Sequence, residues 1–202
     1  MKNNYKVIRQ AISKELADFT YSYFLMKRKV ARKLFDDRYI SPVNADYGVW
    51  NDEQVPETYS HYGDIVMETL LEKLVEPMSK ETELELIPTY SYARIYKKGD
   101  VLKRHKDRYS CEVSMTMNLG GDPWPIYLEP SGETDKEGVK IDLEPGDALI
   151  YRGCEVEHWR EAFEGENCGQ VFLHYNDASG ENAKENAYDR RPFLGLPHWF
   201  KS

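Results

Sequence analysis

Apolar side chains in the first third of the chain recur every three or four positions, as they do along one face of a helix. Ser13 precedes the first such segment, residues 13 to 36, and is a typical N-cap because its hydroxyl can accept a first-turn amide. A second segment begins near residue 65 and ends near Pro77 or shortly after. We therefore predict two amphipathic helices, with apolar positions Leu16, Phe19, Tyr23, Phe24, Val30 and Leu34 in the first and Ile65, Met67, Leu70, Leu71 and Leu74 in the second.

Between these helices, residues 37 to 60 are polar and are interrupted by Pro42, Gly48 and Pro56. An irregular segment of this length in a compact domain is usually functional or mobile. A lid over a binding site and a plain surface loop are both consistent with the pattern.

After Pro88 the pattern changes to short segments of period two, separated by glycine, proline and acidic turns. We predict an α+β fold, in which N-terminal helices back a double-stranded β-helix, or jelly roll. Residues 1–202 would form one domain: 1–84 mainly helical support, 85–176 the jelly-roll core, and 177–202 a tail. The tail is polar and loose to Arg191, and its last apolar residues are expected to dock on the body. The predicted strands are 89–97, 111–119, 125–128, 139–143, 147–151, 155–160 and 170–175.

Strand side chains alternate between two faces, so each predicted strand can be divided into two sets. In residues 111–119 one set is apolar, and the other is small and polar, which suits either a wet cavity or a solvated surface. Three other strands have a face that mixes aromatic and hydrogen-bonding groups, as expected at the mouth of a ligand-binding barrel. These faces are Tyr90, Tyr92, Arg94 and Tyr96; Gln170, Phe172 and His174; and Cys154, Val156, His158 and Arg160.

Composition narrows the class of protein. A length of 202 residues suits one domain, and a net charge of -8 argues against nucleic acid as a partner, because phosphate binding needs a basic face. The basic pair Arg190-Arg191 is interpreted as solvated surface. Three cysteines, Cys111, Cys154 and Cys168, form no Cys-x-x-Cys pair and indicate reduced thiols. No apolar run approaches membrane-spanning length, so we expect a soluble cytoplasmic protein; its oligomeric state is not predicted.

The candidate chemistry lies in two short stretches. His105 and Asp107 are two residues apart, so on a regular strand they share a face, and His158 would come from a facing strand. Two imidazoles and one carboxylate leave half of an octahedral coordination sphere open, the pattern of non-haem Fe(II) oxygenases. Taken alone, His158 is more simply a structural histidine. Order, spacing and strand context together predict that the three residues bind one Fe(II).

Around these residues the chain resembles the 2-oxoglutarate/Fe(II) dioxygenases, and the prolyl 4-hydroxylase-type branch with its small microbial and phage-encoded members in particular. The resemblance covers about residues 85 to 176. It implies Fe(II), 2-oxoglutarate and dioxygen, with ascorbate as an optional accessory reductant, and hydroxylation of a C–H bond. A prolyl residue in a peptide or protein is the first expectation for the substrate; a free amino acid or other small molecule is the alternative. The resemblance rests on Tyr96-Lys97-Lys98-Gly99-Asp100, His105-Lys106-Asp107, Gly146-Asp147-Ala148-Leu149 and His158.

One departure from the family concerns the cation that holds the distal carboxylate of 2-oxoglutarate. The family has an arginine or lysine about ten residues beyond the distal histidine, but Cys168 stands near that position. Arg160 is our candidate replacement, because a guanidinium matches a carboxylate bidentately. Arg94 is second, and a surface role beside Glu157 and Glu161 is the alternative for Arg160. Further co-substrate contacts are expected from Tyr96, Asn118 and Gln170.

Candidate substrate contacts are Arg94, Trp124, Tyr127 and His174, together with the loop of residues 37 to 60. Two rival functions would use the same three metal ligands, His105, Asp107 and His158. One is a metal-binding or ligand-binding jelly roll without oxygenase activity. The other is a nucleic-acid dealkylating oxygenase, which the acidic balance of charge disfavours.

Overall fold

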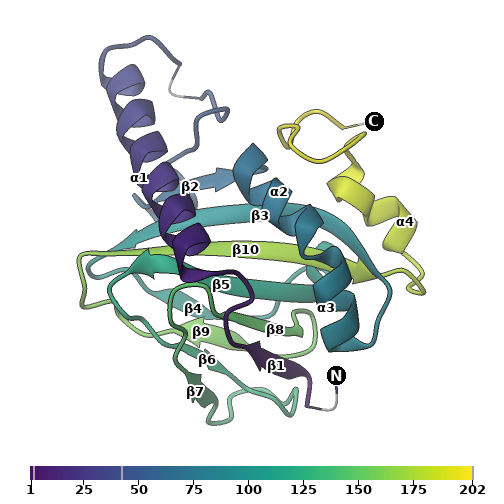
Figure 1. Ribbon diagram of the computed structural model, residues 1–202. Coiled ribbons are helices and arrows are strands. Elements are labelled where there is room, and N and C mark those ends of the chain that lie inside the picture. The colour runs from purple at the N-terminus through teal and green to yellow at the C-terminus, as the bar shows by residue number, and fades with distance from the viewer. Residues whose placement is uncertain (2, 42, 202) are drawn as a thin grey trace.

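Two antiparallel sheets form the body of the protein, whose computed structural model describes residues 1, 3–41 and 43–201. Pro42 lies outside the described residues. The larger sheet has the order β1 (Tyr5–Ile8), β8 (Ala148–Arg152), β5 (Val113–Gly121), β10 (Asn167–Asp177), β3 (Leu86–Lys97) and β2 (Tyr59–Tyr62). The smaller has the order β4 (Leu102–His105), β9 (His158–Arg160), β6 (Ile126–Leu128) and β7 (Val139–Ile141). Helices cover the side of the larger sheet that faces away from the smaller one (Figure 1). The predicted α+β jelly roll is confirmed.

The first helix, α1 (Lys14–Asp36), begins where the pattern predicts, and Ser13 Oγ accepts a hydrogen bond from the Leu16 amide at 3.2 Å. Its buried side is only partly the predicted one. Phe24 is buried as predicted, but Phe19 is 67% exposed, and the other buried positions are Ala17, Thr20 and Ala31. These small side chains let the helix lie close to the sheet on either side of Phe24.

The second predicted helix is divided in two. Helix α2 (Ile65–Lys73) ends before Pro77, and α3 (Val75–Thr82) carries that proline in its first turn, where a missing N–H costs little. The pattern did not predict α3, β1 or β2. Because β1 and β2 are strands of the larger sheet, residues 1–84 contribute to the sheet as well as to its helical support. The remaining short helices are η1 (Tyr109–Cys111), α4 (Ala183–Asn186) and η2 (Ala187–Arg190). Among the described residues, no helix is both long and apolar enough to cross a membrane.

The two faces of β5 lie in different parts of the core. Val113 and Met115 belong to the apolar cluster between the larger sheet and the helices. Ser114, Thr116 and Asn118 are also buried, so their face is not the solvated surface that the sequence left open. Small polar side chains therefore line the space between the sheets.

Strand β9 is shorter than predicted, and this changes which residues share a face. The Glu155 and Val156 amides both donate to the Arg152 carbonyl, forming a turn over residues predicted as strand. Cys154 and Val156 therefore do not lie on a strand face with His158 and Arg160. This tight turn instead precedes β9, which carries His158 and Arg160.

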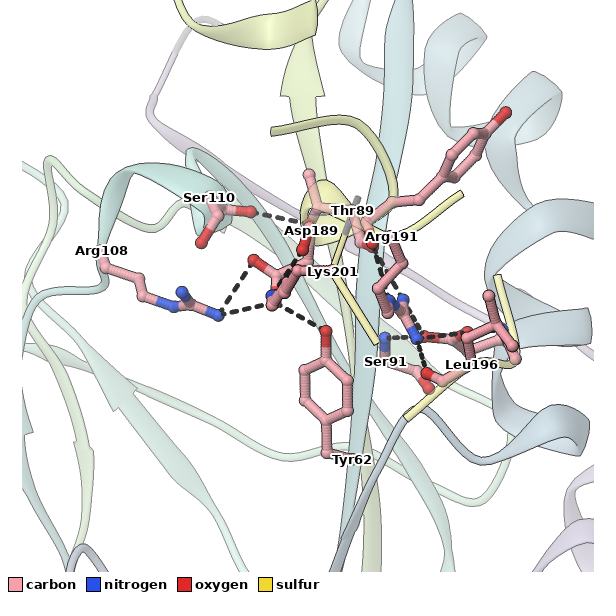
Figure 2. A network of polar contacts seen from close by, with 12 residues as sticks. Tyr62, Thr89, Ser91, Arg108, Ser110, Asp189, Arg191, Leu196 and Lys201 are labelled. Atoms are coloured by element: carbon pink, nitrogen blue, oxygen red, sulfur yellow. Dashed lines mark hydrogen bonds and ion pairs between the residues drawn. The ribbon is translucent and has the colours of Figure 1, made fainter. Parts of the chain in front are cut away.

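The C-terminal segment is not loose, and Arg191 is not solvated surface. Arg191 is 2% exposed and forms an ion pair with Glu68 of α2 at 2.7 Å (Figure 2). Asp189 is buried as well and accepts a hydrogen bond from the Tyr62 hydroxyl at 2.6 Å. The expected apolar docking is only partial, because Leu194 packs on the core whereas Phe193, Trp199 and Phe200 are exposed. Buried polar pairs fix this segment.

Candidate metal centre

Pairing of β4 with β9 brings the predicted metal ligands together, since His105 and His158 are register partners. Oδ1 of Asp107 lies 3.7 Å from Nε2 of His105 and 3.5 Å from Nε2 of His158. Asp107 itself lies two residues beyond the end of β4, so the two-residue spacing does not act through a regular strand. Its amide donates to the Gly153 carbonyl at 2.8 Å, which holds the carboxylate in place.

Hydrogen bonds behind the three side chains orient them toward one point. Nδ1 of His105 is 2.7 Å from the Lys103 carbonyl, and Nδ1 of His158 is 3.3 Å from the Val156 carbonyl. A carbonyl only accepts, so each Nδ1 carries the proton and each Nε2 has a lone pair with which it can bind a metal. Ser114 Oγ donates to Oδ2 of Asp107 at 2.6 Å and fixes the carboxylate in the same way.

The protonation states suit a divalent cation. Burial raises the pKa of Asp107, but the nearby His158 and the hydrogen bond from Ser114 outweigh this effect and lower the pKa to about 2. Burial, together with the charge of His158, lowers the pKa of His105. Near neutral pH the site therefore holds one carboxylate and a neutral His105, and with His158 it has the nitrogen and oxygen donors that Fe(II) takes in non-haem oxygenases. The residues fit the metal.

A pocket of about 360 Å³ opens beside the three ligands, and two residues of the 37–60 loop line it. The Gln54 amide lies 3.1 Å from Nε2 of His105. Asp52 forms an ion pair with Arg94 at 2.5 Å. These contacts favour the lid over the plain surface loop, because the loop reaches the ligands themselves.

Arg160 is 1% exposed, so it is not the surface arginine that the sequence left as an alternative. Its guanidinium donates to the Trp124 carbonyl and, at 3.2 Å, to Oε1 of Gln170. Among the described residues no carboxylate pairs with it, and its Nε has no hydrogen-bond partner. A buried guanidinium without a counter-ion destabilises the folded protein unless an anionic ligand pairs with it.

Arg160 is not part of the lining of the 360 Å³ pocket, but Tyr151 is, and its ring centroid lies 4.7 Å from that of His158. Burial raises the pKa of the Tyr151 phenol, the charge of Asp107 raises it further, and the charge of Arg160 lowers it. Arg94, by contrast, lines the pocket directly and already has Asp52 as its counter-ion.

The other predicted site residues divide into two groups. Arg94 and His174 line the pocket with the metal ligands, and Tyr96 accepts a hydrogen bond from Arg94 at 3.1 Å. Trp124 and Tyr127 do not line it: Trp124 packs on Tyr96, and Tyr127 stacks on Trp159. The amide of Asn118 binds backbone groups, donating to the Leu143 carbonyl and accepting from the Gly120 amide.

Sequence reasoning missed several residues that lie at the site. Ser114 was noted only as one of the small polar positions of β5, and Asp52 and Gln54 only as part of the loop. Arg108 and Cys111 also line the pocket. For Arg108 and Cys111, closeness in sequence to Asp107 was the available signal, because residues that follow a metal ligand in the chain stay near it in space.

No protein-family model and no curated protein matches this chain. Solved structures do match in fold. A prolyl-4-hydroxylase from Pseudomonas putida superposes with a TM-score of 0.56 at 15% identity, over 88% of this chain and 94% of that one. A viral collagen prolyl hydroxylase from Paramecium Bursaria Chlorella virus-1, in a 2-oxoglutarate complex, gives 0.56 at 12% identity, over 85% and 95%.

HygX from Streptomyces hygroscopicus, with nickel, 2-oxoglutarate and hygromycin B bound, gives a TM-score of 0.61 at 13% identity, over 88% of this chain and 84% of that one. These likenesses extend over most of each chain. The fold is therefore that of the 2-oxoglutarate/Fe(II) oxygenases, including the prolyl hydroxylases.

Proposed function

We propose that this protein is an Fe(II)- and 2-oxoglutarate-dependent dioxygenase that hydroxylates a C–H bond. The observation that carries the proposal is the convergence of Nε2 of His105, Oδ1 of Asp107 and Nε2 of His158 beside a pocket. Two imidazoles and one carboxylate on a jelly roll leave coordination positions for a co-substrate and dioxygen. Bound there, Fe(II) supplies oxidation of a C–H bond to C–OH, coupled to conversion of 2-oxoglutarate to succinate and carbon dioxide.

The chain's own residues have three tasks in this proposal. Ser114 and the two carbonyls behind the histidines keep the ligand atoms aimed at one point. Asp52 and Gln54 cover the pocket and limit access of water. The pocket walls hold one C–H bond of the substrate toward the metal, which is a matter of positioning.

Arg160 is the proposed partner of the distal carboxylate of 2-oxoglutarate, with Gln170 and Tyr96 beside it. Support comes from its burial and from its lack of a carboxylate partner among the described residues. A carboxylate would complete the guanidinium with charge-assisted hydrogen bonds. Arg94 is the weaker candidate, since Asp52 already neutralises it.

For the substrate, a prolyl residue in a peptide or protein is proposed first, because two of the fold neighbours are prolyl hydroxylases. A small molecule is the second candidate, since HygX, of the same fold, is described with hygromycin B bound. Arg94 and His174 are the proposed substrate contacts in both cases, because they line the pocket beside the ligands.

The decisive experiment measures succinate release from 2-oxoglutarate under air with Fe(II), with and without a panel of prolyl peptides and free amino acids. Wild type is expected to release succinate, and His158→Ala to release none. His198→Ala, which removes an exposed histidine of the C-terminal segment, is the matched control and should behave as wild type. Metal binding without any 2-oxoglutarate turnover would favour the non-oxygenase metal-binding protein instead.

A further inference from the structure

A third histidine in the pocket has the hydrogen-bonding arrangement of a metal ligand. His174, on β10, is 6% exposed, and its Nδ1 lies 2.9 Å from Ser114 Oγ. Ser114 has one proton and gives it to the carboxylate of Asp107, so Nδ1 of His174 must donate to Ser114. Nε2 of His174 is therefore unprotonated and carries a lone pair, as Nε2 does in His105 and His158.

The carboxylate of Asp107 lies between two groups of ligands. Its Oδ1 is the oxygen nearest to His105 and His158, whereas its Oδ2 is bound to Ser114, which also contacts His174. One side of the carboxylate is thus used by the site described above. The other oxygen is linked through Ser114 to His174, which belongs to a second set of donors.

Cys111 supplies the third donor of that set. Ligand atoms of Asp107, Cys111 and His174 all lie within 4.8 Å of one another, and all three side chains line the 360 Å³ pocket. The thiol is buried and lies 3.0 Å from the Tyr90 hydroxyl. An ion that enters the pocket can therefore reach these donors without passing through the protein interior.

We propose that Asp107, Cys111 and His174 form a second divalent-metal site, which takes a thiolate-binding ion of the Zn²⁺ or Co²⁺ class. Sulfur, nitrogen and oxygen donors suit tetrahedral Zn²⁺, while the first site, without sulfur, suits Fe(II). The Ser114 hydrogen bond gives His174 the outer-shell anchor that ligating histidines usually have. Because both sites use Asp107, Zn²⁺ at the second site is expected to inhibit chemistry at the first.

The test is an anaerobic titration of the metal-free protein with Co²⁺, followed by the near-ultraviolet charge-transfer absorption that Co²⁺ shows only with a thiolate ligand. Wild type is expected to develop this absorption, and Cys111→Ser to lack it. His174→Ala should weaken Co²⁺ binding at this position by about tenfold or more. Cys154→Ser and Cys168→Ser are matched controls that should keep the absorption.

The doubly substituted protein His105→Ala/His158→Ala separates this proposal from the oxygenase site, since it should keep the thiolate absorption while losing any succinate release. Circular dichroism and thermal unfolding show whether each variant is folded. Should Cys111→Ser be unfolded, His174→Ala decides, with Cys154→Ser, Cys168→Ser and the double variant, which all retain Cys111, as controls. Absence of the absorption in wild type at saturating Co²⁺ overturns the second site. So does an absorption that survives in folded Cys111→Ser.

Discussion

The side-chain amide of Gln54 lies 3.1 Å from Nε2 of His105, the nitrogen with which that histidine would bind a metal. Nδ1 of His105 donates to the Lys103 carbonyl, so Nε2 is an acceptor and Gln54 is the donor. A metal ion needs the same lone pair. Metal binding and this contact of the 37–60 loop therefore exclude each other.

Removal of the competing amide should strengthen metal binding. A hydrogen bond contributes about 0.5–1.5 kcal/mol, so Gln54→Ala is expected to bind Mn²⁺ roughly two- to tenfold more tightly, as measured by anaerobic isothermal titration calorimetry. Glu53→Ala is the control, since the neighbouring Glu53 is exposed and should leave the affinity unchanged. Equal or weaker binding by Gln54→Ala would show that the amide does not compete with the ion.

Arg160 and Arg94 should respond differently to the same substitution. Loss of a charge-assisted hydrogen bond costs about 1.5–3 kcal/mol, so Arg160→Met should weaken 2-oxoglutarate binding by roughly ten- to a hundredfold, while Arg94→Met changes it by no more than about threefold. Dissociation constants are measured anaerobically with Mn²⁺ in place of iron. The reverse order of the two effects would assign the distal carboxylate to Arg94.

Arg160→Met should also raise the stability of the protein without co-substrate. The guanidinium is buried with no carboxylate partner among the described residues, and replacement of a buried charge by an apolar side chain of similar size is often stabilising. Urea unfolding is expected to show an equal or higher free energy of unfolding than in wild type. A large loss of stability would mean that the bonds to Trp124 and Gln170 outweigh the burial of the charge.

His174 should make the metal-free protein sensitive to acid. Burial lowers the pKa of His174 to about 4, although the charge of Asp107 opposes the shift. Between about pH 6.5 and pH 4 the unfolded chain binds a proton that the folded protein does not, so the free energy of unfolding falls by about 3 kcal/mol in total. Urea unfolding with a chelator present should show a shallower loss in His174→Gln. Identical pH profiles in the two proteins would contradict this assignment.

Two adjacent arginines of the C-terminal segment provide a matched pair for stability. Arg191 is buried against Glu68, whereas the ion pair of Arg190 with Glu185 is exposed. Arg191→Met leaves the Glu68 carboxylate buried without its cation and should cost about 3–5 kcal/mol, while Arg190→Met should cost about 1 kcal/mol or less. Urea unfolding measures both. Similar losses would mean that burial of Glu68 is not what holds this segment.

Several features of the fold follow from local patterns. The N-cap at Ser13, the period-two segments after Pro88 and the turns between them are properties of neighbouring residues, and the corresponding elements are present. The pattern identified Phe24 on the buried side of α1 but not Ala17 or Ala31, because the choice between Phe19 and the small residues depends on how closely β5 approaches. It also missed β1, whose four residues form a strand only by pairing with β8.

The sequence by itself determined the three candidate ligands, His105, Asp107 and His158, because their identity, order and spacing are properties of the chain. Only the tertiary structure decided which other groups reach the site. Gln54 contacts His105 across 51 residues, Ser114 contacts His174 across 60, and Arg191 contacts Glu68 across 123. Such contacts pair buried charges and hydrogen-bonding groups that the folded backbone brings together. Local periodicity in the sequence does not predict which distant residues these are.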